Sequence, residues 1–260
     1  MKVIILCGGK GTRLREETEY VPKPMVEIGG KPILWHIMKI YSHYGFKDFI
    51  LALGYKGNII KDYFLNYFLY NNDFTLNLGS KENIIVHGNH DERDWKVTLA
   101  NTGENSLTGY RIKLAAKYLD DDENFMVTYG DAVSNVNIKN LYYFHKSQDT
   151  IGTVTGVYPP SRFGDLVLEN DIVIKFKQKI KDIENQFPIN GGFFVFKKEF
   201  LNFIPDNPNT DLEGEPIQKI IELKQLSVYK HTGFWQCMDT YREYVLLNEM
   251  WKDSPLWKVW

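Results

Sequence analysis

The sequence predicts an α/β protein whose core is a mainly parallel β-sheet flanked by helices. Three short apolar runs, 3–6, 49–53 and 125–129, have the length and continuity of strands that are buried on both faces. Segments with helical periodicity alternate with these runs along the first half of the chain. Such alternation is typical of parallel sheets, in which ligands bind beyond the carboxyl ends of the strands.

The helices of the first half are expected over three segments, 33–44, 58–68 and 106–118. Pro32 is tolerated in a first helical turn, and Gly45 is placed to end the first of these helices. Glycines also follow the predicted strands, at Gly8, Gly54 and Gly130. The sequence therefore places a ligand site at this edge of the sheet.

The segment 71–95 differs from its surroundings because it is rich in Asn, Asp and His and has little periodicity. We predict a flap or arm built on a loose hairpin. His87, His90 and Asp91 offer metal-ligand chemistry, but a solvated loop is the favoured interpretation, since no second ligand cluster accompanies them.

The second half is expected to be richer in β-structure. The predicted elements are a strand over 151–158, a hairpin over 166–174 with a polar turn, and helices over 215–223 and 240–251. Asn190, Gly191 and Gly192 interrupt an apolar strand, which suggests that the backbone approaches a ligand closely there.

Bulk composition is that of one globular domain spanning residues 1–260. A formal net charge of −2 without a basic stripe argues against a nucleic-acid or membrane-surface partner. The chain has no apolar run near the length of a membrane span, and Met1 leads directly into a strand, so we expect no signal peptide and a cytoplasmic location. Cys7 and Cys237 are too few for a disulfide framework and are expected to stay reduced, buried near the site.

The stretch after the first strand has the residue types of a phosphate-binding loop. Residues 8–14 are Gly-Gly-Lys-Gly-Thr-Arg-Leu. Glycines permit close approach of the backbone, and free N–H groups in such a turn bind anions. Arg13 adds a fork of donors, and Lys23, held between two prolines, adds an ammonium with restricted freedom. A Gly-rich turn without a ligand is the alternative, but it gives Arg13 and Lys23 no reason to be there.

Two common phosphate loops are excluded. The dinucleotide fingerprint that begins at Gly9 requires a glycine where the chain has Leu14, and no Gly-Lys-Ser/Thr triplet of the ATPase loop occurs.

This loop, followed by Lys23-Pro24, resembles the signature of the sugar-phosphate nucleotidyltransferase family, and the resemblance covers nearly the whole chain. Within the family it is most similar to cytidylyltransferases that act on glucose 1-phosphate. The other matching segments are 23–38, 102–109, 162–164, 189–194 and 233–236. The resemblance implies a Rossmann-like mixed sheet with a small β-rich arm and acceptor subdomain. It also implies a mainly nucleotide-binding half over 1–135 and a mainly sugar-phosphate-binding half over 136–260.

The activity implied by the resemblance is transfer of CMP from MgCTP to a phosphorylated sugar, with release of pyrophosphate. Such a transfer depends on positioning and on neutralisation of charge rather than on covalent catalysis. Arg13 and Lys23 are the catalytic candidates, and Lys23 is expected against the α-phosphate. The implied nucleotide-binding set is Leu6, Cys7, Gly8, Gly9, Gly11, Thr12, Arg13, Lys23, Ser106, Arg111 and Gly130.

The expectation of CTP rests on the segment 102–111, which resembles the part of the family that recognises a pyrimidine. Ser106 and Arg111 match nucleotide contacts there, and a salt-bridged surface arginine is the alternative for Arg111. A UTP- or dTTP-using relative and a non-catalytic regulatory homologue are further alternatives for the whole chain.

Mg²⁺ is the implied cofactor, with Asp131 and Asp239 as its candidate ligands. Mg²⁺ prefers one or two carboxylates together with phosphate oxygens and water. Each aspartate has an alternative role as a capping residue, and this alternative is strongest for Asp239, which precedes the C-terminal helix.

The implied sugar-phosphate set is Arg162, Gly164, Gln178, Lys179, Asn190, Gly191 and Glu213. Lys179 is expected to meet the phosphate of the sugar. The chain departs from the family pattern near this pocket, at Gln178, Ile180, Ala132, Asn135 and Asp165. Two interpretations remain open: neutral drift with glucose 1-phosphate retained, or another acceptor such as fructose 6-phosphate or a polyol phosphate.

Oligomerisation is expected from the apolar groups near the C-terminus and in the arm. Trp251, Trp257 and Trp260 crowd the last ten residues, and the segment 71–95 is flanked by aromatic residues. Exposed apolar clusters usually mark interfaces, so we expect a homo-oligomer, and the resemblance suggests a hexamer.

Overall fold

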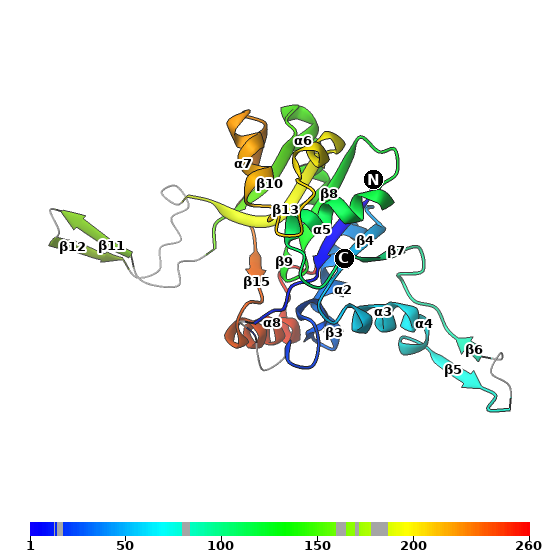
Figure 1. Cartoon of the computed structure of the whole chain (residues 1–260). Coiled ribbons are helices and arrows are strands. Elements are labelled where there is room, and N and C mark those ends of the chain that lie inside the picture. The colour runs from blue at the N-terminus through cyan, green and yellow to red at the C-terminus, as the bar shows by residue number, and fades with distance from the viewer. Residues whose placement is uncertain (13, 15–17, 80–83, 160–164, 170–171, 178–186) are drawn as a thin grey trace.

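The computed structural model describes residues 1–12, 14, 18–79, 84–159, 165–169, 172–177 and 187–260. Within these ranges the centre is a seven-stranded sheet in the order β14-β10-β13-β8-β1-β4-β7 (Figure 1). Its strands are β1 (Val3–Cys7), β4 (Asp48–Leu53), β7 (Lys96–Asn101), β8 (Asn124–Tyr129), β10 (Gly152–Val157), β13 (Ile189–Lys197) and β14 (Leu226–His231).

The sheet is mainly parallel, as the sequence predicts. Strand β1 lies between β4 and β8 and is parallel to both, and β7 continues this parallel set beside β4. Strand β13 is the exception, because it runs antiparallel to β8 and β10, whereas β10 and β14 are parallel. The carboxyl ends of β1, β4, β7 and β8 therefore meet at one edge of the sheet.

Helices cover both faces of this sheet (Figure 1). They are α2 (Ile33–His43), α3 (Gly57–Leu65), α4 (Tyr67–Tyr70), α5 (Thr108–Ala115), α6 (Ile138–Gln148), α7 (Glu215–Glu222) and α8 (Tyr241–Asp253), with 3₁₀ turns η1 (Lys23–Met25), η2 (Ala116–Tyr118) and η4 (Lys198–Phe203). Because side chains alternate along a strand, Val3 and Ile5 of β1 pack in one core cluster with α2, whereas Ile4 packs in the other with α5 and α7. No helix in the described ranges has the length and apolar character needed to cross a bilayer.

Two predicted helices have different bounds in the structure. The helix expected near 58–68 is divided into α3 and α4 at Asn66, whose side-chain amide donates to the carbonyl of Asp62 at 2.9 Å. The helix expected over 106–118 begins only at Thr108, because Leu107 is extended and its N–H bonds to the carbonyl of Pro208 instead. These exceptions involve contacts that local periodicity does not reveal.

The arm predicted over 71–95 is confirmed as a hairpin of β5 (Asp73–Leu76) and β6 (Ile84–His87), which extends from the body beside α4 (Figure 1). His87 bonds to the hydroxyl of Thr75 at 2.8 Å, and His90 packs edge-on against the rings of Tyr67 and Phe68.

The second predicted hairpin is also confirmed, as the antiparallel pair β11 (Asp165–Glu169) and β12 (Ile172–Lys177). The remaining short strands form the pairs β2 (Glu27–Ile28) with β3 (Lys31–Pro32), and β9 (Ala132–Ser134) with β15 (Trp235–Cys237).

The expectation that the C-terminal tryptophans form an exposed cluster is wrong. Trp257 is 0 % exposed, and its indole N–H donates to Nδ1 of His36 on α2 at 3.4 Å. Trp251 and Trp260 pack around the same imidazole, with ring centroids 4.7 and 6.2 Å away. The chain after α8 thus returns to the body and covers α2, so these tryptophans stabilise the protomer itself.

Candidate active site

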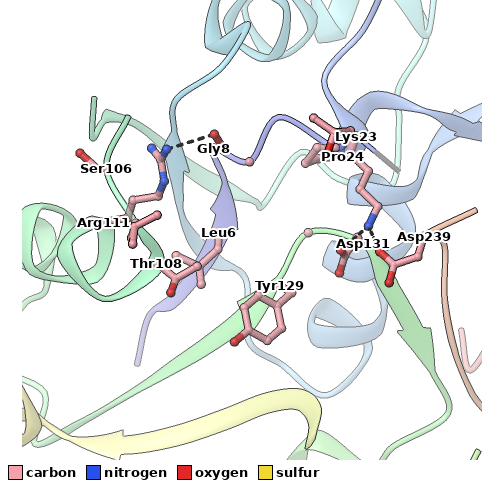
Figure 2. Close-up of a pocket in the computed structure, with 15 residues that line it drawn as sticks. Leu6, Gly8, Lys23, Pro24, Ser106, Thr108, Arg111, Tyr129, Asp131 and Asp239 are labelled. Carbon is pink, nitrogen blue, oxygen red and sulfur yellow. Dashed lines mark hydrogen bonds and ion pairs between the residues drawn. The ribbon is translucent and has the colours of Figure 1, made fainter. Parts of the chain in front are cut away.

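A cavity of about 300 Å³ opens at the carboxyl ends of β1 and β8 (Figure 2). Its lining residues are Leu6, Gly8, Gly9, Gly11, Thr12, Lys23, Pro24, Ser106, Leu107, Thr108, Arg111, Tyr129, Gly130, Asp131 and Asp239. All the predicted nucleotide-binding residues line it except Cys7 and Arg13. Cys7 is fully buried at the end of β1, and Arg13 lies outside the described residues.

The loop that follows β1 is shaped by two glycines. A Cβ on Gly8 would lie 2.1 Å from the guanidinium carbon of Arg111, so a larger residue would expel that side chain. Gly11 has a φ of +61°, which disfavours residues with a Cβ. The hydroxyl of Thr18 lies 3.0 Å from the carbonyl oxygen of Gly11 and 2.7 Å from that of Leu14, which braces the far end of the loop.

Arg111 lies inside the protein rather than on its surface. It is 4 % exposed, and burial lowers the pKa of its guanidinium, which still keeps its charge. Its two terminal nitrogens donate five hydrogen bonds, to the carbonyl oxygens of Gly8, Leu53, Gly103 and Glu104 and to the hydroxyl of Thr102. These acceptors lie at or just after the ends of β1, β4 and β7. The alternative of a salt-bridged surface arginine is therefore wrong, and Arg111 joins three neighbouring strand ends beneath the loop.

Lys23 contacts two carboxylates on one side of the cavity (Figure 2). Its ammonium donates to Oδ2 of Asp131 at 2.6 Å and to Oδ1 of Asp239. Burial lowers the pKa of Lys23, but attraction and hydrogen bonds from Asp131, and then from Asp239, outweigh burial and raise the pKa above its ordinary value. Lys23 therefore carries a full positive charge at neutral pH.

Asp131 and Asp239 meet because of the β9–β15 pairing, which sets Ala132 opposite Cys237. The N–H of Met238 donates to the carbonyl oxygen of Asp131 at 2.9 Å, which places the two aspartates side by side.

The helix-capping alternative for Asp239 is wrong. The residue that caps α8 is Thr240, which forms a capping box with Glu243. Oε2 of Glu243 accepts hydrogen bonds from the N–H groups of Asp239 and Thr240 at 2.8 and 2.9 Å. The Asp239 carboxylate is thereby left to point into the cavity toward Lys23.

The two aspartates fit a divalent cation. One oxygen from each carboxylate converges on a single ammonium, so the same pair can converge on a single metal ion. Hard carboxylate oxygens are the protein ligands that Mg²⁺ prefers, and phosphate oxygens and water complete its coordination.

Two of the predicted acceptor residues, Glu213 and Asn190, are linked by hydrogen bonds to the cavity residue Tyr129, and Gly191 follows Asn190 in β13. The carboxylate of Glu213 accepts hydrogen bonds from the Tyr129 hydroxyl and from the side-chain amide of Asn190. The carbonyl oxygen of Gly191 accepts from the indole N–H of Trp235 at 2.8 Å. The other predicted acceptor residues, Arg162, Gly164, Gln178 and Lys179, lie outside the described residues.

Tyr129 and Thr108 are cavity residues that the sequence analysis did not identify. Tyr129 is the last residue of the buried strand β8, directly before Gly130 and Asp131. This position at a strand end could have identified Tyr129 as a cavity residue from the sequence. The hydroxyl of Thr108 accepts from the N–H of Leu212 at 2.9 Å and donates to the carboxylate of Asp211. That link attaches the segment carrying Glu213 to the start of α5.

The family model described as Nucleotidyl transferase matches residues 2–254 of the chain. The chain belongs to the nucleotidyl transferase family. Two family relatives are the glucose-1-phosphate cytidylyltransferases of Salmonella typhi and Salmonella typhimurium, each 48 % identical over 261 residues, with 100 % of both chains covered. The fold is similar to that of the inositol-1-phosphate CTP transferase from T. maritima, with a TM-score of 0.63 at 17 % identity over 97 % of this chain and 96 % of that one.

Of the departures from the family pattern that the structure describes, Ala132 and Asn135 lie close to Asp131 in the chain, whereas Asp165 lies in the β11–β12 hairpin. Ala132 follows Asp131 and is 5 % exposed. Asn135 lies just beyond β9, with its N–H bonded to the carbonyl of Phe234 at 3.2 Å. Asp165 begins β11, and Gln178 and Ile180 lie outside the described residues.

Proposed function

We propose that this nucleotidyl transferase is a cytidylyltransferase that transfers CMP from MgCTP to glucose 1-phosphate, giving CDP-glucose and pyrophosphate. The observation that carries the proposal is the identity of 48 % along the whole chain to curated glucose-1-phosphate cytidylyltransferases. The geometry supports it, because a lysine and two aspartates lie in one cavity with the Gly-rich loop.

In the proposed reaction, a phosphate oxygen of the sugar attacks the α-phosphorus of the nucleotide. A new phosphorus–oxygen bond forms, and the bond from the α-phosphorus to the pyrophosphate oxygen breaks. The loop N–H groups of residues 8–12 bind the triphosphate, and Lys23 offsets the negative charge that grows on the α-phosphate. Arg13 is assigned to the triphosphate by resemblance.

Asp131 and Asp239 would hold Mg²⁺ against the phosphates. When bound, the ion neutralises charge on the triphosphate and helps to align it for in-line attack. The protein's part is to fix the two carboxylates side by side, through the β9–β15 pairing and the capping box at the start of α8.

We assign the acceptor to Asn190, Gly191 and Glu213, together with Arg162, Gly164, Gln178 and Lys179. The held carboxylate of Glu213 is suited to accept hydrogen bonds from sugar hydroxyls. In this proposal residues 1–135 form the mainly nucleotide-binding half and residues 136–260 the mainly sugar-phosphate-binding half, and Asp239 of the second half contributes to the metal site.

A pyrophosphate-release screen tests the proposal. Four nucleoside triphosphates are combined with glucose 1-phosphate, fructose 6-phosphate and several polyol phosphates in the presence of Mg²⁺. We expect CTP with glucose 1-phosphate to give the highest kcat/KM. A preference for UTP or dTTP would contradict the assignment of CTP, and a preference for fructose 6-phosphate would contradict the assignment of glucose 1-phosphate. No turnover with any pair would favour a regulatory homologue.

We also propose that the protein is a homo-oligomer, in which the arm meets another copy. The β5–β6 hairpin exposes Phe74, Leu76, Leu78 and Ile85, of which Leu78 is 91 % exposed. A two-stranded hairpin is only marginally stable alone in water, so a partner that covers these side chains would stabilise it. The resemblance suggests a hexamer.

Light scattering at micromolar concentration tests this assembly. The double variant Leu76→Ser/Ile85→Ser should reduce the measured mass, whereas Leu223→Ser, which removes an exposed leucine just beyond α7, should not. A monomer mass for the unaltered protein would contradict the proposal.

A further inference from the structure

We infer that Lys23 takes the place of the divalent cation between Asp131 and Asp239 in the nucleotide-free protein, so that metal and nucleotide can bind well only together. The inference rests on the proposed triphosphate and metal sites and adds an order of events to them. In it, the nucleotide draws Lys23 from the carboxylates to the phosphates, and the cation enters as the lysine leaves.

The geometry places one cation where another would have to bind. The ammonium of Lys23 lies 2.6 Å from Oδ2 of Asp131 and also donates to Oδ1 of Asp239. A Mg²⁺ ion held about 2.1 Å from these same two oxygens would lie against the ammonium. Because both groups are positive and the site is largely shielded from water, their mutual repulsion is strong. The lysine and the metal therefore compete for the carboxylates.

The ammonium of Lys23 has a second possible binding position, beside the Gly-rich loop. The Lys23 backbone is held by η1 between Pro22 and Pro24, whereas the four-carbon stem of a lysine is flexible and can carry the ammonium to another position by a change of rotamer. A Cβ built on Gly11 would lie 3.1 Å from Cβ of Lys23, so the stem starts directly beside the loop. Lys23 also lines the same cavity as Gly9 and Gly11. A triphosphate bound by this loop would thus offer its oxygens to the ammonium close to the present position.

Charge balance makes the two movements depend on each other. If Lys23 left without a replacement, Asp131 and Asp239 would both lose the ammonium that they now share. If a metal entered without a phosphate, the lysine would lose its partners while still inside the cavity. Such coupling is reciprocal: the factor by which nucleotide raises metal affinity equals the factor by which metal raises nucleotide affinity.

Direct Mn²⁺ binding, with no nucleotide or sugar present, tests the inference. Free Mn²⁺ is measured by electron paramagnetic resonance during titration of the protein. We expect no site in the micromolar range for the unaltered chain, and at least tenfold tighter binding at one site for Lys23→Met, which keeps the stem and removes the charge. Lys23→Met/Asp131→Asn should lose this gain. Lys47→Met, which breaks the exposed ion pair with Asp94, should behave like the unaltered chain.

Thermal unfolding gives a second readout. Lys23→Met removes the ammonium that both carboxylates bind, so its melting temperature should fall. Mn²⁺ should restore the melting temperature, because a ligand that binds the folded state stabilises it. If Lys23→Met binds Mn²⁺ no better than the unaltered chain, the inference is wrong. If the variant does not fold, the titration of the unaltered chain decides, since micromolar Mn²⁺ binding there without nucleotide overturns the inference. Neither measurement needs turnover, so each remains decisive whichever nucleotide and sugar the screen selects.

Discussion

The hydroxyl of Tyr129 donates a hydrogen bond of 2.9 Å to Oε1 of Glu213, and this bond joins the nucleotide cavity to the candidate acceptor site. The same carboxylate oxygen accepts from the amide of Asn190, whose own oxygen accepts from the N–H of Gly192 at 2.8 Å. Burial first, and then the charge of Glu213, raise the pKa of Tyr129. The phenol therefore keeps its proton at neutral pH and remains a donor to the carboxylate.

Tyr129→Phe should weaken acceptor binding while leaving nucleotide binding nearly unchanged. The ring and its packing on Phe194 are retained, and only the hydrogen bond to a charged partner is lost. A bond of this kind contributes about 1.5–3 kcal/mol, so KM for the sugar phosphate should rise roughly tenfold or more. Steady-state kinetics with each substrate varied separately measure this. Tyr143→Phe, which alters an exposed tyrosine on α6, is the matched control, and an equal rise in both KM values would reject the assigned role.

Asp131→Asn should reduce kcat by about 10²–10³-fold, the usual loss when one preorganised electrostatic contact is removed. The amide is nearly isosteric but carries no charge to attract a cation or Lys23.

Lys23→Ala should reduce kcat by a similar factor, because the negative charge that develops on the α-phosphate then lacks its counterion. Asp94→Asn removes an exposed ion-pair partner of Lys47 and should leave kcat unchanged. Turnover near the normal rate by either site variant at saturating Mg²⁺ would defeat these assignments.

Arg111→Met should destabilise the fold, in addition to any effect on nucleotide binding. It would remove the five hydrogen bonds of the buried guanidinium. The carbonyl oxygens of Leu53 and Gly8 keep other donors, in Thr102 and in the N–H of Tyr55. We therefore expect the free energy of unfolding to fall by about 1–3 kcal/mol in urea titrations. Arg242→Met, which alters an exposed arginine on α8, should change it by less than about 0.5 kcal/mol. A loss for Arg111→Met as small as that of the control would show that the carbonyl contacts contribute little.

Stability should decrease as the pH falls from 6.5 toward 4, because two histidines are buried in neutral form. His145 is 1 % exposed and bonds to Thr153 and Asn124, and burial chiefly lowers its pKa from 6.5 to about 4. Burial also lowers the pKa of His36 to about 4. Between these values the unfolded chain binds protons that the folded chain does not. Within this range each histidine therefore lowers the free energy of unfolding by about 1.4 kcal/mol for every unit by which the pH falls. Above pH 6.5 neither histidine reduces the stability.

Urea unfolding at several pH values measures this slope. His145→Gln should reduce it by about 1.4 kcal/mol per pH unit, while His43→Gln, which removes an exposed histidine of α2, should leave it unchanged. An unaltered slope in His145→Gln would mean that the buried imidazole is not the group that takes up the proton.

Much of the fold could be predicted because its signals are local. Apolar runs such as Val3–Cys7 are long enough for a buried strand and too short for most helices, and the Gly-rich stretch after that run predicted the loop that now lines the cavity. Lys23 could be selected because two prolines flank it beside this loop. The break between α3 and α4 at Asn66 and the start of α5 at Thr108 could not be predicted, because each depends on a hydrogen bond that periodicity does not encode.

The amino-acid sequence by itself determined the α/β class and the Gly-rich loop with Lys23, because these depend on residue type, spacing and periodicity, and the resemblance of its motifs indicated the family together with Asp131 and Asp239. Only the tertiary structure decided how those groups are used. Pairing of β9 with β15 brings Asp131 and Asp239 to one ammonium, Thr240 rather than Asp239 caps α8, and five hydrogen bonds hold Arg111 beneath the loop. The C-terminal tryptophans, an interface candidate in the sequence, pack instead around His36. The physical reason is the same in each case: burial and hydrogen-bond partners are set by segments far apart in the chain, and their meeting is a property of the packed fold.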